Sequence, residues 1–281
     1  SDGVMTISGS GEMDGYATNA PWSSYISKIK KVVVKGSVES IGYAAFSGCS
    51  AITELDLNNA TKLSSIGTQS FQNCTALQKL NLPGAITKVG IDAFYHCTAL
   101  ISVTMDVNLS ANAECEIAAR AFAGCRNLKE VSLSDNVAII DNYAFQNCTS
   151  LENVRLSNNL TKIYDGVFKG CTSLKAVILP ENITYLGAEI FSQVPITEVT
   201  IPSSLEKCGK GTQYTDGVTY IHTLFENCNS LTSATITPGM VTIPANLFCN
   251  ANSLQYVNIP NTVTSIGENA FYGCMSLEAI Y

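Results

Sequence analysis

Phenylalanine recurs along this 281-residue chain at nearly constant intervals. Successive phenylalanines are separated by 25, 23, 28, 23, 23, 23, 34, 23 and 23 residues. A fixed period of this length is typical of a solenoid, in which each unit buries its apolar edges only against its neighbours. Every phenylalanine of the chain belongs to this series: Phe46, Phe71, Phe94, Phe122, Phe145, Phe168, Phe191, Phe225, Phe248 and Phe271.

Within each unit, the spacing between apolar residues changes part-way along. In "LQKLNLPGAITKVGIDAFYHC", Leu80 and Leu82 alternate with polar residues, which predicts a short strand with one buried face. Further on, Ala93, Phe94 and Cys97 are spaced as on one stripe of a helix, which predicts a short helical turn. The sequence therefore predicts an α/β solenoid of about eleven rungs of about 23 residues, with short parallel strands and short helical turns.

The chain divides into an N-terminal cap and a repeat region. Residues 1–28 lack the pattern and hold the only tryptophan, Trp22, so we expect them to cover the first rung. Residues 29–281 form the predicted solenoid, with insertions near 106–116 and 210–221. The second insertion predicts a β-hairpin packed on the rod, with "TDGV" as its turn. The chain begins at Ser1 and shows no signal peptide, so we expect a targeting or anchor segment to be missing from it.

Eleven cysteines are present, and eight of them share one column of the repeat. Val194 and Ala251 replace cysteine in two units, so the column favours a small apolar side chain and we expect buried, reduced thiols. Cross-rung disulfides are the alternative, because adjacent rungs bring such positions close together. Cys115 and Cys249 lie outside the column and are the expected reactive thiols.

The neighbouring pair of His96 and Cys97 raises the question of thiol catalysis or metal binding. In most other units the residue before the column cysteine is glycine or asparagine, which tolerate a positive φ angle. Histidine is also enriched at positive φ, so His96 is predicted to fill a helix-ending position. The two histidines lie in different units and no C-x-x-C pair occurs. We therefore predict no catalytic, cofactor-binding or metal-ligating residue.

Residues that point outward from the predicted strands form columns across the rungs, and the insertions add further exposed positions. This surface is mostly polar and mildly acidic in its N-terminal half, which favours a cation or a basic partner. Tyrosine in the second insertion favours contact with a partner, because it buries area with few torsions to fix. The candidate partner-binding residues are Glu54, Asp56, Asp106, Glu130, Arg155, Glu198, Tyr256, Tyr214, Tyr220 and His222.

Three strings carry a family resemblance: "SIGYAAFSGCSAITELDL", "SIGENAFYGCMSLEAI" and "VGIDAFYHCTALISVTM". Their order of phenylalanine, cysteine and a following aliphatic residue resembles the BspA-like, or Treponema pallidum-type, leucine-rich repeat over about residues 29–281. The resemblance implies a leucine-rich-repeat solenoid, a right-handed superhelix, in a secreted or surface-exposed bacterial protein, typically of Bacteroides-like species. The members of that family studied as adhesins are associated with host extracellular-matrix proteins and with bacterial coaggregation. The motif residues are structural, so no binding residue carries over.

The expected function is that of a secreted or cell-surface, non-enzymatic module for protein binding or adhesion. Its expected partner is a host extracellular-matrix protein, another cell-surface protein or a glycan, and no cofactor is expected. The net charge of −7 disfavours nucleic acid, and no apolar run approaches the roughly 20 residues of a membrane span. The alternative is a structural spacer that displays another domain of a longer surface protein. An enzyme is disfavoured because no nucleophile elbow, phosphate loop or carboxylate pair stands out.

Overall fold

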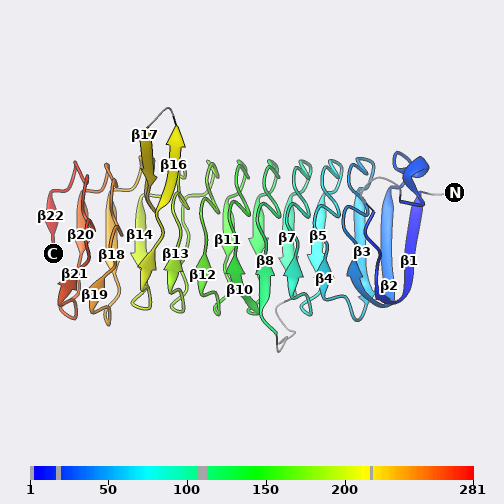
Figure 1. The fold of residues 1–281 in the computed structure, drawn as a ribbon, viewed down its shortest axis with the longest axis horizontal. Helices are drawn as coiled ribbons and strands as arrows, with labels where there is room; N and C mark the ends of the chain where they lie inside the picture. Colours follow the sequence, from blue (N-terminus) through cyan, green and yellow to red (C-terminus); the bar gives the residue numbers. More distant parts are fainter. Residues whose placement is uncertain (1–2, 17–19, 107–112, 216–217) are drawn as a thin grey trace.

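The computed structural model describes residues 3–16, 20–106, 113–215 and 218–281. Its coils stack along one long axis, with the two termini at opposite ends (Figure 1). The stack contains about eleven turns, so the predicted solenoid is confirmed. Buried apolar side chains form one continuous core that extends from Ile29 to Ala270.

One side of the solenoid consists of the strands predicted by the alternating leucines. These strands are β3 (Glu54–Ala60), β5 (Lys79–Leu82), β7 (Ser102–Met105), β9 (Glu130–Ser132), β11 (Asn153–Arg155), β14 (Glu198–Ile201), β18 (Ser233–Ile236), β20 (Tyr256–Asn258) and β22 (Ala279–Ile280). In β5, Leu80 and Leu82 are buried while the alternating Lys79 and Asn81 are exposed. Leu80 lies opposite Val103 of β7 in a parallel pair. We call the outward side of these strands the leucine-strand face.

A second side is formed by strands of two to four residues that follow in the same units, together with the end of an 11-residue strand whose start pairs with β3 on the first side. They are β2 (Lys31–Ile41), β4 (Ser65–Ile66), β6 (Lys88–Val89), β8 (Cys115–Ile117), β10 (Val137–Ile140), β12 (Lys162–Ile163), β13 (Tyr185–Leu186), β15 (Lys207–Cys208), β19 (Thr242–Ile243) and β21 (Ser265–Ile266). Hydrogen bonds join these strands in the order β2-β4-β6-β8-β10-β12-β13-β15, and β19 pairs with β21. From β2 to β15 this side is therefore one uninterrupted parallel ladder.

The turns that carry the phenylalanines are not helices, which corrects the α/β expectation. Among the described residues the one helix is the 3-10 helix η1 (Ser23–Tyr25), outside the repeats. Each turn has residues with left-handed backbone, such as Asp92 (φ 55°) and His96 (φ 57°), and such residues interrupt an α-helix. Between them, Ala93 N and Tyr95 N bond within the turn, whereas Phe94 N donates to Ala121 O of the next rung at 2.8 Å. Stacking of rungs therefore uses some of the amides that a helix would pair internally.

His96 has the positive φ angle predicted for it, at a turn position instead of a helix end. Its left-handed φ is shared by the equivalent Asn73 and Asn147 (φ 59° and 57°). The imidazole covers Gly124 of the next rung, where an added Cβ would lie 2.1 Å from His96 Cδ2, so only glycine fits there. The Cys97 thiol instead donates to Phe71 O at 3.2 Å inside the core. The two side chains therefore do not form a reactive pair.

The phenylalanine rings stack on one another through the core, with neighbouring ring centroids between 5.1 and 6.2 Å apart. Column thiols bond to this stack: Cys125 Sγ donates to Phe94 O at 3.2 Å and Cys148 Sγ to Phe122 O at 3.3 Å. The column therefore uses cysteine as a hydrogen-bond donor as well as a small apolar side chain. All eleven cysteines are free thiols in the structure.

The N-terminal residues add a strand and a ring to the first rung. β1 (Val4–Glu12) pairs in parallel with β2, with Met5 opposite Val32. Trp22 stacks on Phe46 with centroids 5.4 Å apart, and its Nε1 donates to Ala45 O at 2.9 Å. Trp22 thus continues the aromatic stack by one member, and the assignment of residues 1–28 as a cap stays a prediction.

The second insertion forms a β-hairpin, as predicted. β16 (Gly211–Thr215) pairs in antiparallel with β17 (Val218–His222), while the expected turn residues Asp216 and Gly217 lie outside the described residues. The hairpin extends beyond the coils instead of packing on the rod (Figure 1), since its strands pair with each other and with no other described strand. Of the first insertion, residues 107–112 also lie outside the described residues.

Candidate functional site

Two of the predicted acidic residues are already bound to a lysine. Glu54 and Asp56 belong to β3, and Lys31 Nζ lies 2.6 Å from Glu54 Oε1 and 3.6 Å from Asp56 Oδ2. The hydrogen bond to Glu54 raises the pKa of Lys31. The structure thus brings these two residues together around an internal cation, which reduces their attraction for a basic partner.

Two other predicted residues, Glu130 and Arg155, meet in a groove on the leucine-strand face. The groove has a volume of about 920 Å³ and lies over β9, β11 and residues 175–178. Charges of both signs line the groove, because Glu152 and Lys175 lie there together with Glu130 and Arg155. Its apolar lining residues are Val103, Val131, Val154, Ala176 and Ile178. Apolar lining with a few placed polar groups is typical of binding sites.

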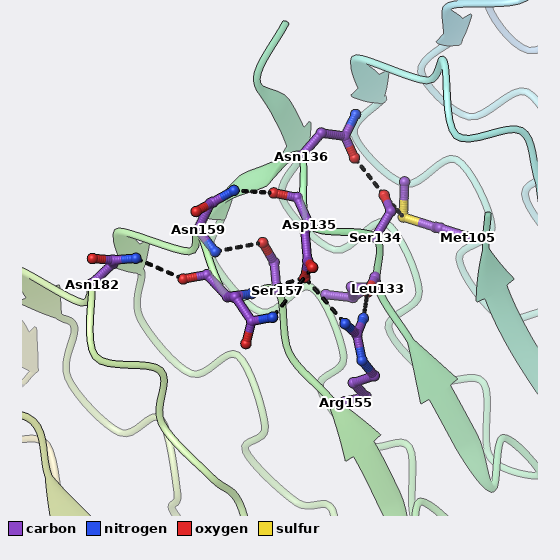
Figure 2. A network of polar contacts seen from close by, with 10 residues as sticks. Met105, Leu133, Ser134, Asp135, Asn136, Arg155, Ser157, Asn159 and Asn182 are labelled. Carbon is purple, nitrogen blue, oxygen red and sulfur yellow. Dashed lines mark hydrogen bonds and ion pairs between the residues drawn. The ribbon is translucent and has the colours of Figure 1, made fainter. Parts of the chain in front are cut away.

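The turns that follow β9 and β11 hold Arg155 in place (Figure 2). Arg155 Nη2 lies 3.2 Å from Asp135 Oδ1, and Nη1 donates to Leu133 O. Asp135 also accepts the backbone amide of Asn158 at 3.1 Å, and this bond, followed by the Arg155 charge, lowers the pKa of Asp135. The guanidinium is therefore oriented before any partner arrives, which lowers the entropy cost of binding.

The strand ladder is broken beneath this groove. In the preceding rungs, Lys129 N donates to Ile101 O at 2.8 Å and Glu152 N donates to Lys129 O at 3.0 Å. Lys175 is next in this column, yet residues 175–178 form no strand, and within the described chain their amides and carbonyls make no backbone hydrogen bond. Among described strands, β11 pairs only with β9, and β14 only with β18. Unpaired backbone groups are therefore available to another chain at this point.

A second interruption of the ladder, between β3 and β5, has a different consequence. There β3 pairs with β2 and not with β5, but Leu55 and Leu80 stay buried, so the core remains closed. At the groove the inward-pointing Val154 and Val177 are only half-buried, whereas Val131 one rung earlier is buried. Of these two places, solvent therefore reaches the edge of the core only at the groove.

The phenylalanine rings also lie further apart in this part of the stack. Ring centroids are 5.1–5.3 Å apart from Phe46 to Phe145, but 5.9, 6.2 and 6.0 Å apart from Phe145 to Phe225. The buried residue before each phenylalanine is small in the first five units and branched in the next four: Ala45, Ser70, Ala93, Ala121 and Ala144, then Val167, Ile190, Leu224 and Leu247. In a close-packed interior the larger side chains need more room between rungs. We infer that this position sets the rung spacing.

Ile178, which the sequence pattern did not single out, marks the groove most clearly. Its side chain is 86% exposed, at an outward position where most other units carry a polar residue. An aliphatic residue in an otherwise polar column is the signal that could have identified it. Glu152 and Lys175 were also missed. Each lies one residue before the first outward-pointing position that the alternating pattern of its strand defines.

Glu198 and Tyr256 lie on the same face but outside this groove. Both lie opposite Ser233, on either side of β18, so one strand separates them. Tyr256 OH donates to Glu278 Oε2 at 2.8 Å, and this bond raises the pKa of Tyr256. The predicted strand-face residues therefore fall into three separate groups.

The remaining candidates lie near the two insertions. Asp106 lines a smaller cavity of about 340 Å³ beside β3 and β5. The side chains of Tyr214 and Tyr220 lie outside the described part of the structure. His222, at the end of β17, lies 2.9 Å from Glu226, measured from Nδ1 to Oε2.

Burial corrects the choice of reactive thiols. Cys115 and Cys249 are 1% and 6% exposed, because both side chains face the interior. Desolvation raises the pKa of Cys115 to about 12 and also raises the pKa of Cys249. The half-buried thiols are Cys208 and Cys274.

The repeat pattern corresponds to a known family over most of the chain. The family model described as BspA type leucine rich repeat region matches residues 23–115, 107–215 and 218–281, with six copies. The chain belongs to the BspA-type leucine-rich-repeat family. The resemblance carried by the sequence motif is thereby confirmed. No curated protein matches the chain.

Two solved structures resemble this BspA-type chain. A leucine-rich repeat protein from Bacteroides ovatus is 30% identical, with 86% of this chain and 69% of that chain covered and a TM-score of 0.50. The leucine-rich repeat protein of T. pallidum is 28% identical, with 63% of this chain and 78% of that chain covered and a TM-score of 0.50. Both support the solenoid fold.

Membership of the BspA-type family indicates a protein-interaction module, since the leucine-rich-repeat fold is typical of proteins that bind other proteins. The same fold is typical of non-enzymatic proteins. Within the described ranges of the chain, no helix has the length and apolar character needed to cross a bilayer.

Proposed function

We propose that this chain is a secreted or cell-surface, non-enzymatic adhesion module that binds an extended segment of a partner protein in the groove over β9, β11 and residues 175–178. The observation that carries the proposal is the broken ladder, where unpaired backbone groups lie beside the exposed Ile178. Extended polypeptides bind open sheet edges through main-chain hydrogen bonds and gain specificity from alternate side chains.

The lining of the groove supports a segment of mixed character. Ile178 offers apolar contact, while the same depression is also lined by two basic and two acidic residues, Arg155, Lys175, Glu130 and Glu152. Such a lining suits a segment that carries an apolar residue between charges of both signs. The partner we propose is a host extracellular-matrix protein or another cell-surface protein, because the unpaired backbone favours a polypeptide over a glycan.

Substitution of two equally exposed residues tests the groove. Ile178→Asp should weaken binding to immobilised matrix and cell-surface proteins at least tenfold, because a carboxylate then replaces the apolar contact. Met275→Asp is the matched control, since Met275 is also 86% exposed but lies in the last rung. Equal binding by both variants would place the partner elsewhere. If the wild type binds none of the panel, the spacer alternative is favoured.

We also propose the hairpin, with Tyr214 and Tyr220, as a second contact with the partner. Deletion of residues 210–221 removes a segment whose strands pair only with each other among described strands. The rest of the solenoid should therefore keep its circular dichroism spectrum while partner affinity falls. Unchanged affinity would exclude the hairpin from binding.

A further inference from the structure

One histidine and two glutamates converge where the hairpin rejoins the solenoid. His222 ends β17, Glu226 lies in the turn around Phe225, and Glu189 lies in the turn of the preceding rung. His222 Nδ1 is 2.9 Å from Glu226 Oε2 and 3.6 Å from Glu189 Oε1. One ligand atom from each residue lies within 4.8 Å of the others. Three segments of the chain thus direct nitrogen and oxygen ligands to one point.

These separations are close to those around a bound metal ion. Zinc bonds to nitrogen and oxygen are about 2.0–2.2 Å long, so ligand atoms at the corners of a tetrahedron lie about 3.3 Å apart. The two distances from His222 Nδ1 lie on either side of that value. One imidazole and two carboxylates form a mixed ligand set that suits Zn²⁺, with a fourth position left for water.

The charges of the cluster also favour a cation. At the same turn position in an earlier rung, Asp92 is paired through both oxygens with Arg120, at 2.8 and 2.7 Å. Glu189 is 9% exposed at its side chain and pairs with Lys169 at 2.7 Å. Glu226 has no lysine or arginine partner within the described residues. At Asp92 one carboxylate is balanced by one arginine, whereas Glu189 and Glu226 together have only one lysine partner.

Glu189 is held in an unusual backbone conformation at this point. Its φ of 54° lies in the left-handed region, which residues other than glycine adopt infrequently. Its amide donates to Thr223 O of the next rung at 2.9 Å, so rung stacking fixes the carboxylate beside residues 222–226. The ligand atoms are therefore positioned by the fold before any ion binds, which lowers the cost of assembling the site.

We propose that Glu189, His222 and Glu226 bind a zinc ion through Glu189 Oε1, His222 Nδ1 and a carboxylate oxygen of Glu226. Lys169, whose side chain is 29% exposed, leaves Glu189 and turns to solvent when the ion binds. The ion then joins the end of β17 to the turns of two successive rungs and fixes the direction in which the hairpin leaves the solenoid. This site is separate from the groove and does not depend on the proposed function.

Titration of the reduced, chelator-treated protein with ZnCl₂ tests the site. Isothermal titration calorimetry should show one ion per chain in the wild type and affinity at least tenfold weaker in Glu226→Gln, which keeps the side-chain shape. His96→Asn changes the other histidine of the chain and should leave the affinity within twofold. Lys169→Met should bind at least threefold more tightly, because the ion no longer competes with the lysine.

Several results would overturn the proposal. They are an absence of zinc binding in the wild type, wild-type affinity in Glu226→Gln, and loss of binding in His96→Asn. An ion held by thiols would bind Glu226→Gln with wild-type affinity, so that result also covers binding by cysteine. Thermal unfolding gives an independent measurement: at the same zinc concentration, zinc should raise the Tm of the wild type more than that of Glu226→Gln. Glu189→Gln is the second variant should Glu226→Gln fail to fold.

Discussion

The first half of the solenoid stacks its phenylalanine rings more tightly than the second. From Phe46 to Phe145 the rings are 5.1–5.3 Å apart, whereas from Phe145 to Phe225 they are 5.9–6.2 Å apart and the pairing of the leucine strands stops at β11. The motif is the same in both halves, but the residue before phenylalanine changes from alanine or serine to a branched side chain. The comparison teaches that the repeat motif sets the fold while a position within it sets the spacing.

The largest effect is expected from removing a ring of the tight half. Phe94 lies 5.3 Å from both neighbouring rings, so Phe94→Ala should lower the free energy of unfolding by about 3–5 kcal/mol through the cavity it leaves. Phe191 lies 6.2 and 6.0 Å from its neighbours, and Phe191→Ala should cost about 1 kcal/mol less, because its packing contacts are looser. Urea denaturation measures both. An equal or larger loss for Phe191→Ala would break the comparison.

An intermediate effect is expected from enlarging the spacing residue. Ala121→Ile should cost about 1–3 kcal/mol, because it forces extra volume between rungs whose phenylalanine rings are only 5.3 Å apart. A crystal structure of the variant should show wider spacing between Phe122 and its neighbours. Leu224→Ile, which conserves volume, should cost less than about 1.5 kcal/mol. Unchanged ring spacing in Ala121→Ile would show that the volume of this residue does not set the spacing.

A smaller effect is expected from proline at two exposed lysines in the same column. Lys129 N donates a ladder bond to Ile101 O, whereas Lys175 N makes no backbone bond. Lys129→Pro should therefore lower the free energy of unfolding by about 1 kcal/mol more than Lys175→Pro, because only the first loses a hydrogen bond. Denaturant unfolding of the two variants gives the difference. Equal losses would show that the ladder is continuous in solution.

The smallest perturbation is chemical labelling of the thiols in the native protein. The tight half holds only buried cysteines, such as Cys97, whose pKa desolvation raises to about 12. Iodoacetamide at neutral pH should therefore modify Cys274 first and Cys208 next. Only these two thiols are half-buried, and desolvation raises the pKa of Cys274 to about 11 but that of Cys208 to about 12. Mass spectrometry of the digested protein identifies the sites. Early labelling of Cys115 or Cys249 would contradict the burial that the structure assigns to them.

The sequence predicted the stacked core well, because the same requirement recurs in every unit. Phe94, Cys97 and Leu80 lie at repeated positions, so a single packing solution could be inferred from ten copies. The helical turns were wrong because spacings of three and four residues arise equally from turns that bond to the next rung. Such bonds, like that from Phe94 N to Ala121 O, join residues far apart in the chain and leave no local signal.

The candidate site was predicted only in part. Glu130 and Arg155 were identified because they occupy outward positions of a regular strand. The groove they share depends on the neighbouring rung at residues 175–178, where pairing fails, and pattern reasoning extends regular pairing to every unit. The proximity of Lys31 to Glu54 and of Glu189 to His222 was missed for a related reason, since each pair joins different rungs.

The sequence by itself determined the period, the identity of the buried column residues and the family, because each of these repeats along the chain. Only the tertiary structure decided where the ladder opens, which charges pair and which thiols stay accessible. Those properties depend on which side chains adjacent rungs bring together and on how side chains of unequal volume fill the space between two units, which neither unit specifies alone.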